Sequence, residues 1–151
     1  MRVVIQRVRQ ASVTIADQKV AEITGGMVVL VGISKNDKPA DAEYLAHKTA
    51  NLRIFADDSG KLNRSLIDCG GQVLVVSQFT LYGDCRRGNR PDFFTAAAPD
   101  GAQCLYEYYV KQLQSYGLSV QTGVFQADML VDIANDGPVT IIIESKAKKG
   151  E

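Results

Sequence analysis

Met27-Val28-Val29-Leu30-Val31-Gly32-Ile33 is the stretch that decides the fold, because it carries no polar side chain. A short, continuous apolar run suits a strand that is covered on both of its faces. Gly25 and Gly26 precede the run and predict a turn. The run is far shorter than the roughly 20 apolar residues that cross a bilayer. We therefore expect a buried central strand and no membrane contact.

Further strands and two helices are predicted on either side of this run. Upstream, residues 3–8 and 11–15 carry β-branched residues with an alternating pattern, and Val3, Ile5 and Arg7 share one face. Helical spacing of apolar residues predicts helices at about 39–51 and 100–116, the first beginning at a proline. The remaining strands are predicted at 52–55, 72–77, 129–134 and 139–144.

These elements predict an α/β fold in a single domain over residues 1–145. We expect a mostly antiparallel, barrel-like β-sheet with two main helices, because parallel βαβ units would need more helices than the sequence offers. Residues 146–151 form a charged tail that we expect to be disordered.

The composition excludes several classes of protein. The chain has 151 residues, 46% of them hydrophobic and 23% charged, which is typical of one globular domain. Its formal net charge of zero argues against a protein that grips long nucleic acids through phosphates, but allows contact with one nucleic-acid end. The start shows no secretory pattern, so a cytoplasmic location is expected. Cys69, Cys85 and Cys104 match no zinc or redox spacing.

The usual catalytic and cofactor motifs are absent from the sequence. The only histidine, His47, lies on the first predicted helix, and nothing places it beside a nucleophile. The sequence has no phosphate-binding loop, dinucleotide glycine pattern or cluster of metal ligands. We therefore expect no metal and no cofactor, and an enzyme of this kind would need little chemistry from its side chains.

Two short polar segments are the candidate site. Ser77-Gln78-Phe79-Thr80 ends a predicted buried strand, where polar groups can line a pocket at the rim of the sheet. Asn135-Asp136-Gly137-Pro138 has the composition of a turn. Taken alone, the first segment is equally a strand end whose hydroxyls satisfy the backbone. The X-Pro bond in the second is the usual place for a cis peptide, and the sequence does not decide between cis and trans.

The sequence resembles the D-aminoacyl-tRNA deacylase family over nearly all of residues 1–145. Several motifs occur in order and at family-like spacing, which makes a chance match improbable even though each motif alone is weak. The matching stretches are residues 6–8, 11–13, 76–81, 88–91, 127–129 and 135–140.

The resemblance implies a homodimer whose sites are shared across the interface. In it, Gly137 and Pro138 of one subunit complete the partner's site, and Arg7 holds that segment in place. The implied catalytic residues are Ser77, Gln78, Phe79 and Thr80, and the implied substrate-binding residues are Gly137, Pro138, Arg7 and Met129.

The implied activity is hydrolysis of the ester bond of D-aminoacyl-tRNAs, and of glycine mischarged on alanine tRNA. Backbone carbonyls of Gly137 and Pro138 would hold the amino group, so that an L side chain collides with main chain. The tRNA 2′-hydroxyl would assist catalysis, with backbone N–H donors from Phe79 and Thr80.

Two alternatives remain open at the level of the sequence. One is an esterase that uses Thr80 as nucleophile on small D-amino-acid derivatives, and the other is a non-catalytic tRNA-binding module. Arg86, Arg87 and Arg90 follow the first segment and could touch tRNA phosphates, although a solvated basic loop explains them equally.

Overall fold

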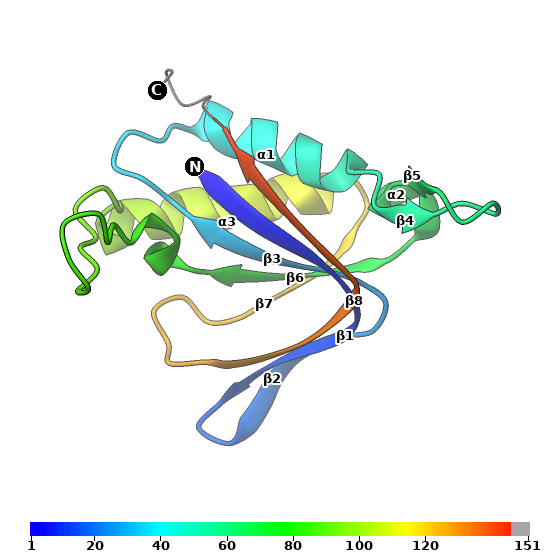
Figure 1. Cartoon of the computed structure of the whole chain (residues 1–151), viewed down its shortest axis with the longest axis horizontal. Coiled ribbons are helices and arrows are strands. Elements are labelled where there is room, and N and C mark those ends of the chain that lie inside the picture. The colour runs from blue at the N-terminus through cyan, green and yellow to red at the C-terminus, as the bar shows by residue number, and fades with distance from the viewer. Residues whose placement is uncertain (146–151) are drawn as a thin grey trace.

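Strand β1 (Arg2–Ile15) is the strand around which the sheet is organised in the computed structural model, which describes residues 1–145 (Figure 1). Its first half pairs with β3 (Gly26–Gly32) and its second half with β2 (Gln18–Ile23), both antiparallel. Along its other edge it pairs with β8 (Leu130–Glu144). The β1–β8 register shifts on both sides of Val8. Such irregularities bend a strand, and they let the second half of β1 curl over the sheet.

The other half of the sheet is parallel, so the prediction of a mostly antiparallel sheet is wrong there. Strand β6 (Gln72–Ser77) runs parallel to β3, and β7 (Ser119–Thr122) runs parallel to β6. Each parallel pair needs one crossover connection, and each crossover contains one long helix. Two long helices are therefore enough for two parallel pairs of strands, whereas the prediction assumed that parallel pairs would need more helices.

The two predicted helices are α1 (Pro39–Asn51) and α3 (Pro99–Ser115), and both cover the same face of the sheet (Figure 1). Their apolar stripes pack with β1, β3 and β6 in the larger of two hydrophobic clusters. The hydroxyls of Thr49 and Tyr109 are both fully buried and lie 2.8 Å apart, which joins the two helices.

The opposite face of the sheet is covered by the curled part of the same sheet, which consists of β2, the second half of β1 and the part of β8 paired with it. Val13, Ile23, Leu74 and other apolar side chains fill the space between the two layers of strands. The backbone N–H of Glu22 on β2 donates to Oε1 of Gln121 on β7 at 3.1 Å, which links the two edges of the sheet. The fold is thus a single α/β domain with a nearly closed, mixed sheet.

Four short elements complete the fold, and the sequence pattern missed most of them. They are β4 (Phe55–Ala56), β5 (Leu62–Arg64), α2 (Leu66–Cys69) and the 3-10 helix η1 (Phe79–Tyr82). The strand predicted at 52–55 is reduced to β4.

Two further boundaries differ from the prediction. The pair of strands predicted at 3–8 and 11–15 is one strand, β1, and the pair at 129–134 and 139–144 is likewise one strand, β8. The tail predicted at 146–151 lies outside the described residues. Among residues 1–145, no helix has the length and hydropathy needed to span a membrane.

Candidate active site

A cavity of about 720 Å³ opens where strands β3 and β6 end. Val31 and Ser77 line it from these two strand ends, and Gln78 and Phe79 from the start of η1. The loop before α3 and the segment before β8 supply the remaining walls, and Met129 lies in the second of these. The cavity is therefore built from four parts of the chain that are far apart in sequence.

The chain turns sharply after Ser77 because β3 and β6 hold its backbone there. The N–H of Gln78 donates to the carbonyl of Val31 at 2.8 Å, and η1 begins at the next residue. Helix η1 packs directly on Gly32, where an added Cβ would lie 3.0 Å from Cβ of Leu81. Arg2 fixes the far end of η1 by donating from Nη1 to the carbonyl of Leu81 at 2.7 Å.

Helix η1 begins with Phe79, a residue that lines the cavity. The first hydrogen bond of this helix runs from Leu81 N–H to the carbonyl of Gln78, so the amides of Phe79 and Thr80 precede it. Helix starts leave such N–H groups without an intrahelical acceptor. The Phe79 ring is 59% exposed and meets Phe93 edge to face, with centroids 5.0 Å apart. The site thus offers backbone donors beside an exposed aromatic wall.

Few titratable side chains line the cavity. Among the lining residues only Lys35 and Asp128 carry an ionisable group. His47 lies on α1, where Nδ1 is 3.3 Å from the hydroxyl of Tyr116, and it does not line the cavity. At the end of η1, burial raises the pKa of Tyr82 to about 12. The lining therefore holds no histidine or cysteine to act as a base or nucleophile.

The second predicted segment lies in β8 and contains a cis peptide bond between Gly137 and Pro138. Arg7 holds this region: Nε donates to the carbonyl of Asp136 at 3.0 Å and Nη1 to the carbonyl of Ile54 at 2.8 Å. Gly137 has φ +129°, and a Cβ there would come within 2.9 Å of Nη2 of Arg7. Only glycine fits this position without displacing its neighbours.

The predicted site residues fall into two groups within one chain. Ser77, Gln78, Phe79 and Met129 line the cavity, whereas Thr80 does not, and its hydroxyl accepts a hydrogen bond from Nε2 of Gln78. Arg7, Gly137 and Pro138 lie together, away from the cavity lining.

Sequence reasoning missed several residues of the cavity wall. The lining also includes Lys35, Phe93, Phe125 and Asp128. The first lies in a loop, the others lie in irregular segments, and no periodic pattern marks such positions. The one available signal is the motif at residues 127–129, which includes Asp128.

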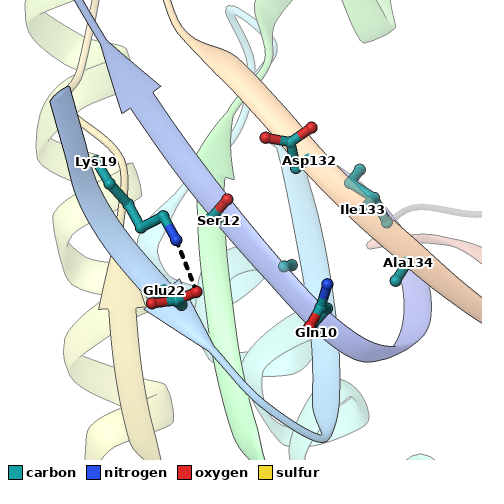
Figure 2. A pocket seen from close by; sticks show the side chains of 8 residues that line it. Gln10, Ser12, Lys19, Glu22, Asp132, Ile133 and Ala134 are labelled. Carbon is teal, nitrogen blue, oxygen red and sulfur yellow. Dashed lines mark hydrogen bonds and ion pairs between the residues drawn. The ribbon is translucent and has the colours of Figure 1, made fainter. Parts of the chain in front are cut away.

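A second, polar hollow of about 430 Å³ lies on the outer face of β1, β2 and β8 (Figure 2). The strand register places Ser12 opposite both Glu22 and Asp132, so the three side chains form a row across the sheet. Nζ of Lys19 lies 2.8 Å from Oε1 of Glu22. None of the predicted site residues lines this hollow.

The fold and the site together define a small, single-domain α/β protein whose cleft offers backbone groups and an apolar wall more than reactive side chains. A sequence model of the family described as D-Tyr-tRNA(Tyr) deacylase matches residues 4–144. The chain is 56% identical to the D-aminoacyl-tRNA deacylase of Thermus aquaticus over 150 residues, a match that covers 99% of each of the two chains. It is 54% identical to the Bacillus cytotoxicus protein of the same name, over 97% of this chain and 100% of the relative.

A solved structure has the same fold. The c-Myc DNA Unwinding Element Binding Protein superimposes with a TM-score of 0.92 and 42% identity, over 97% of this chain and 100% of the other. The chain therefore belongs to the D-Tyr-tRNA(Tyr) deacylase family.

Proposed function

We propose that this protein hydrolyses the ester bond of D-aminoacyl-tRNAs, and of glycine mischarged on alanine tRNA, in the cavity at the ends of β3 and β6. The observation that carries the proposal is a cavity that has Phe79, the first residue of η1, in its lining and neither histidine nor cysteine there. An aminoacyl ester is already activated, so its hydrolysis needs orientation and charge stabilisation more than a strong nucleophile.

The backbone amides of Phe79 and Thr80 are the oxyanion donors of this proposal. As the carbonyl carbon becomes tetrahedral, negative charge develops on its oxygen, and a fixed N–H donor is typically worth about 2.7–4 kcal/mol at that stage. The ribose 2′-hydroxyl of the tRNA assists the attack of water. Thr80 is not the nucleophile, because its hydroxyl is engaged by Gln78 and no base faces it among the described residues.

A second copy of the chain completes the site. The Gly137–Pro138 segment does not line its own chain's cavity, and the proposal seats it in the cavity of a partner. There its carbonyls hold the substrate's amino group and leave one open direction, which a D side chain or the hydrogen of glycine can take. An L side chain collides with main chain, so substrates are selected by exclusion.

Strand β8 supports this assembly. It pairs only with β1, so its other edge makes no strand pairing within residues 1–145. Leu130 is 64% exposed and Ile142 is 65% exposed on the same strand. Exposed apolar side chains on an unpaired edge favour association with another chain. The substrate class also implies action in the cytoplasm, where tRNA is charged.

The test is hydrolysis of D-tyrosyl-tRNA in two forms, one ending in adenosine and one in 2′-deoxyadenosine. We expect release of D-tyrosine from the first, at least about a hundredfold slower release from the second, and most of the activity retained by Thr80→Ala. L-tyrosyl-tRNA should remain charged. An intact ester after incubation with the normal D-substrate would reject the deacylase, and a folded but inactive Thr80→Ala protein would reject the mechanism.

A further inference from the structure

The loop of residues 83–95, which we call the rim loop, borders the cavity between η1 and α3. Asp84 and Asp92 close its base through two backbone hydrogen bonds, 2.8 and 3.0 Å long. Phe93 lines the cavity, while none of the residues between the two aspartates does. In Figure 1 the rim loop projects from the end of the molecule opposite β4 and β5.

The exposed part of the rim loop carries an excess of positive charge. Arg86 is held by Asp84, with Nη2 2.6 Å from Oδ2, and the hydrogen bonds from Arg86 lower the pKa of Asp84 to about 2. Asp92 is engaged as well, because Oδ1 accepts from the N–H of Phe94 at 3.0 Å. Arg87 and Arg90 are exposed and form no ion pair within residues 1–145. The rim loop therefore has three arginines against two aspartates, a net charge of +1, in a chain whose formal net charge is zero.

Two aromatic residues, Phe93 and Phe94, follow these cations in the chain. Phe94 is 78% exposed, and Nζ of Lys35 lies over its ring at 3.6 Å from the centroid. Phe93, the preceding residue, contacts the ring of Phe79 edge to face at the rim of the cavity. Exposed aromatic rings combined with a positively charged track are the features with which proteins bind single-stranded nucleic acid, since every base can stack and every linkage carries a phosphate.

We propose that the rim loop is the docking surface for the single-stranded acceptor end of the tRNA, with Arg87 and Arg90 on its phosphates and Phe94 stacked on a base. This inference rests on the proposed function, because it assumes that the ester lies in the adjoining cavity. Arg90 is three residues from Phe93, a span of at most about 10 Å of chain. At about 3.4 Å per phosphate along a strand, the span to Arg90 corresponds to roughly three nucleotides, and the span of six residues to Arg87 to about twice as many.

Binding and hydrolysis are measured separately to test this inference. The binding probe is a fluorescein-labelled, uncharged RNA minihelix with a CCA end, titrated with full-length protein between 50 and 200 mM salt. The hydrolysis substrates are D-tyrosyl-tRNA and 3′-O-D-tyrosyl-adenosine, which has no phosphate. The variants are the double substitution Arg87→Gln/Arg90→Gln and, separately, Phe94→Ala. Arg64→Gln is the control for loss of an arginine elsewhere, because Arg64, on β5 at the other end of the molecule, is exposed and pairs with Asp58.

The double variant should bind the minihelix about tenfold more weakly, and the slope of log K against log salt should fall by about 1.4, or about 0.7 for each phosphate. Phe94→Ala should lose about fivefold in affinity with an unchanged slope. The double variant should hydrolyse 3′-O-D-tyrosyl-adenosine at the parent rate, because this substrate has no phosphate.

Any of three results would overturn the inference. These are an unchanged salt slope in the double variant, an equal effect of Arg64→Gln on binding, or an equal loss of the double variant's activity on both hydrolysis substrates. If the parent cleaves neither ester while RNA binding still depends on Arg87 and Arg90, the proposed function fails and the docking surface stands.

Discussion

Arg7 and Arg9 offer the sharpest test of how the Gly137–Pro138 segment is held, because both contact Asp136 in different surroundings. The Arg7 side chain is 15% exposed and donates to the carbonyls of Asp136 and Ile54 at 3.0 and 2.8 Å. The Arg9 side chain is 83% exposed, and its Nε meets Oδ1 of Asp136 at 3.3 Å. Replacing either arginine with glutamine removes one positive charge from the same neighbourhood, so the two variants control for each other.

The expected magnitudes differ severalfold. A hydrogen bond from a charged group contributes about 1.5–3 kcal/mol, so the loss of two in Arg7→Gln should lower the free energy of unfolding by about 3 kcal/mol or more. For a chain of this length that corresponds to a fall in Tm of about 6–12 °C. Arg9→Gln removes a surface pair and should cost about 0.5 kcal/mol at most. Arg7→Gln should also lower kcat/KM for D-tyrosyl-tRNA about a hundredfold, because the segment that it positions would shift.

Urea unfolding, followed by far-UV circular dichroism at one fixed protein concentration, measures the first quantity, and single-turnover deacylation measures the second. The fixed concentration matters because association would make the apparent stability concentration-dependent. Equal losses of stability in the two variants would refute the assignment of Arg7 as the anchor. A destabilised Arg7→Gln protein with full activity would refute its positioning role.

Two further predictions concern Gly137 and the shared site. Gly137→Ala should lose about 1–3 kcal/mol of stability, because the φ of +129° and the nearby Arg7 side chain oppose a Cβ at this position. The control Gly101→Ala should gain up to about 1 kcal/mol, because an added Cβ there would have no atom within 4 Å. Equal shifts in Tm for the two variants would contradict this prediction. If the site is shared, a Gly137 variant and a cavity-lining variant that are each inactive alone should together restore about one quarter of the parent deacylation rate after subunit exchange. No recovery in a mixture that demonstrably exchanges subunits would reject the donated segment.

Periodicity in the sequence determined the two long helices and the central strands. Helix α1 spans residues 39–51 as predicted, since its apolar stripe and its first-turn proline are local signals. Strand β6 likewise occupies residues 72–77. Both elements are encoded within their own residues, so local physical chemistry is enough to find them.

Only part of the candidate site could be predicted from local patterns in the sequence. The polar residues after β6 predicted a pocket at a strand end, and Ser77, Gln78 and Phe79 do line a cavity there. Lys35 and Phe125 reach the same cavity from irregular segments, which carry no periodicity. The assignment of the two segments to one shared site stays a prediction, because within a single chain Gly137 and Phe79 belong to separate regions.

What the sequence alone determined is therefore the set of elements and the residues on each face of them. Which strands run parallel was decided only by the tertiary structure: β3 and β6 align because α1 lies in the connection between them, and a strand's own residues do not state its neighbour's direction. The tertiary structure also decided that Arg7 reaches Asp136 and Ile54, residues 129 and 47 positions away. Contacts of that range depend on how the whole sheet curls, and no local pattern in the chain records them.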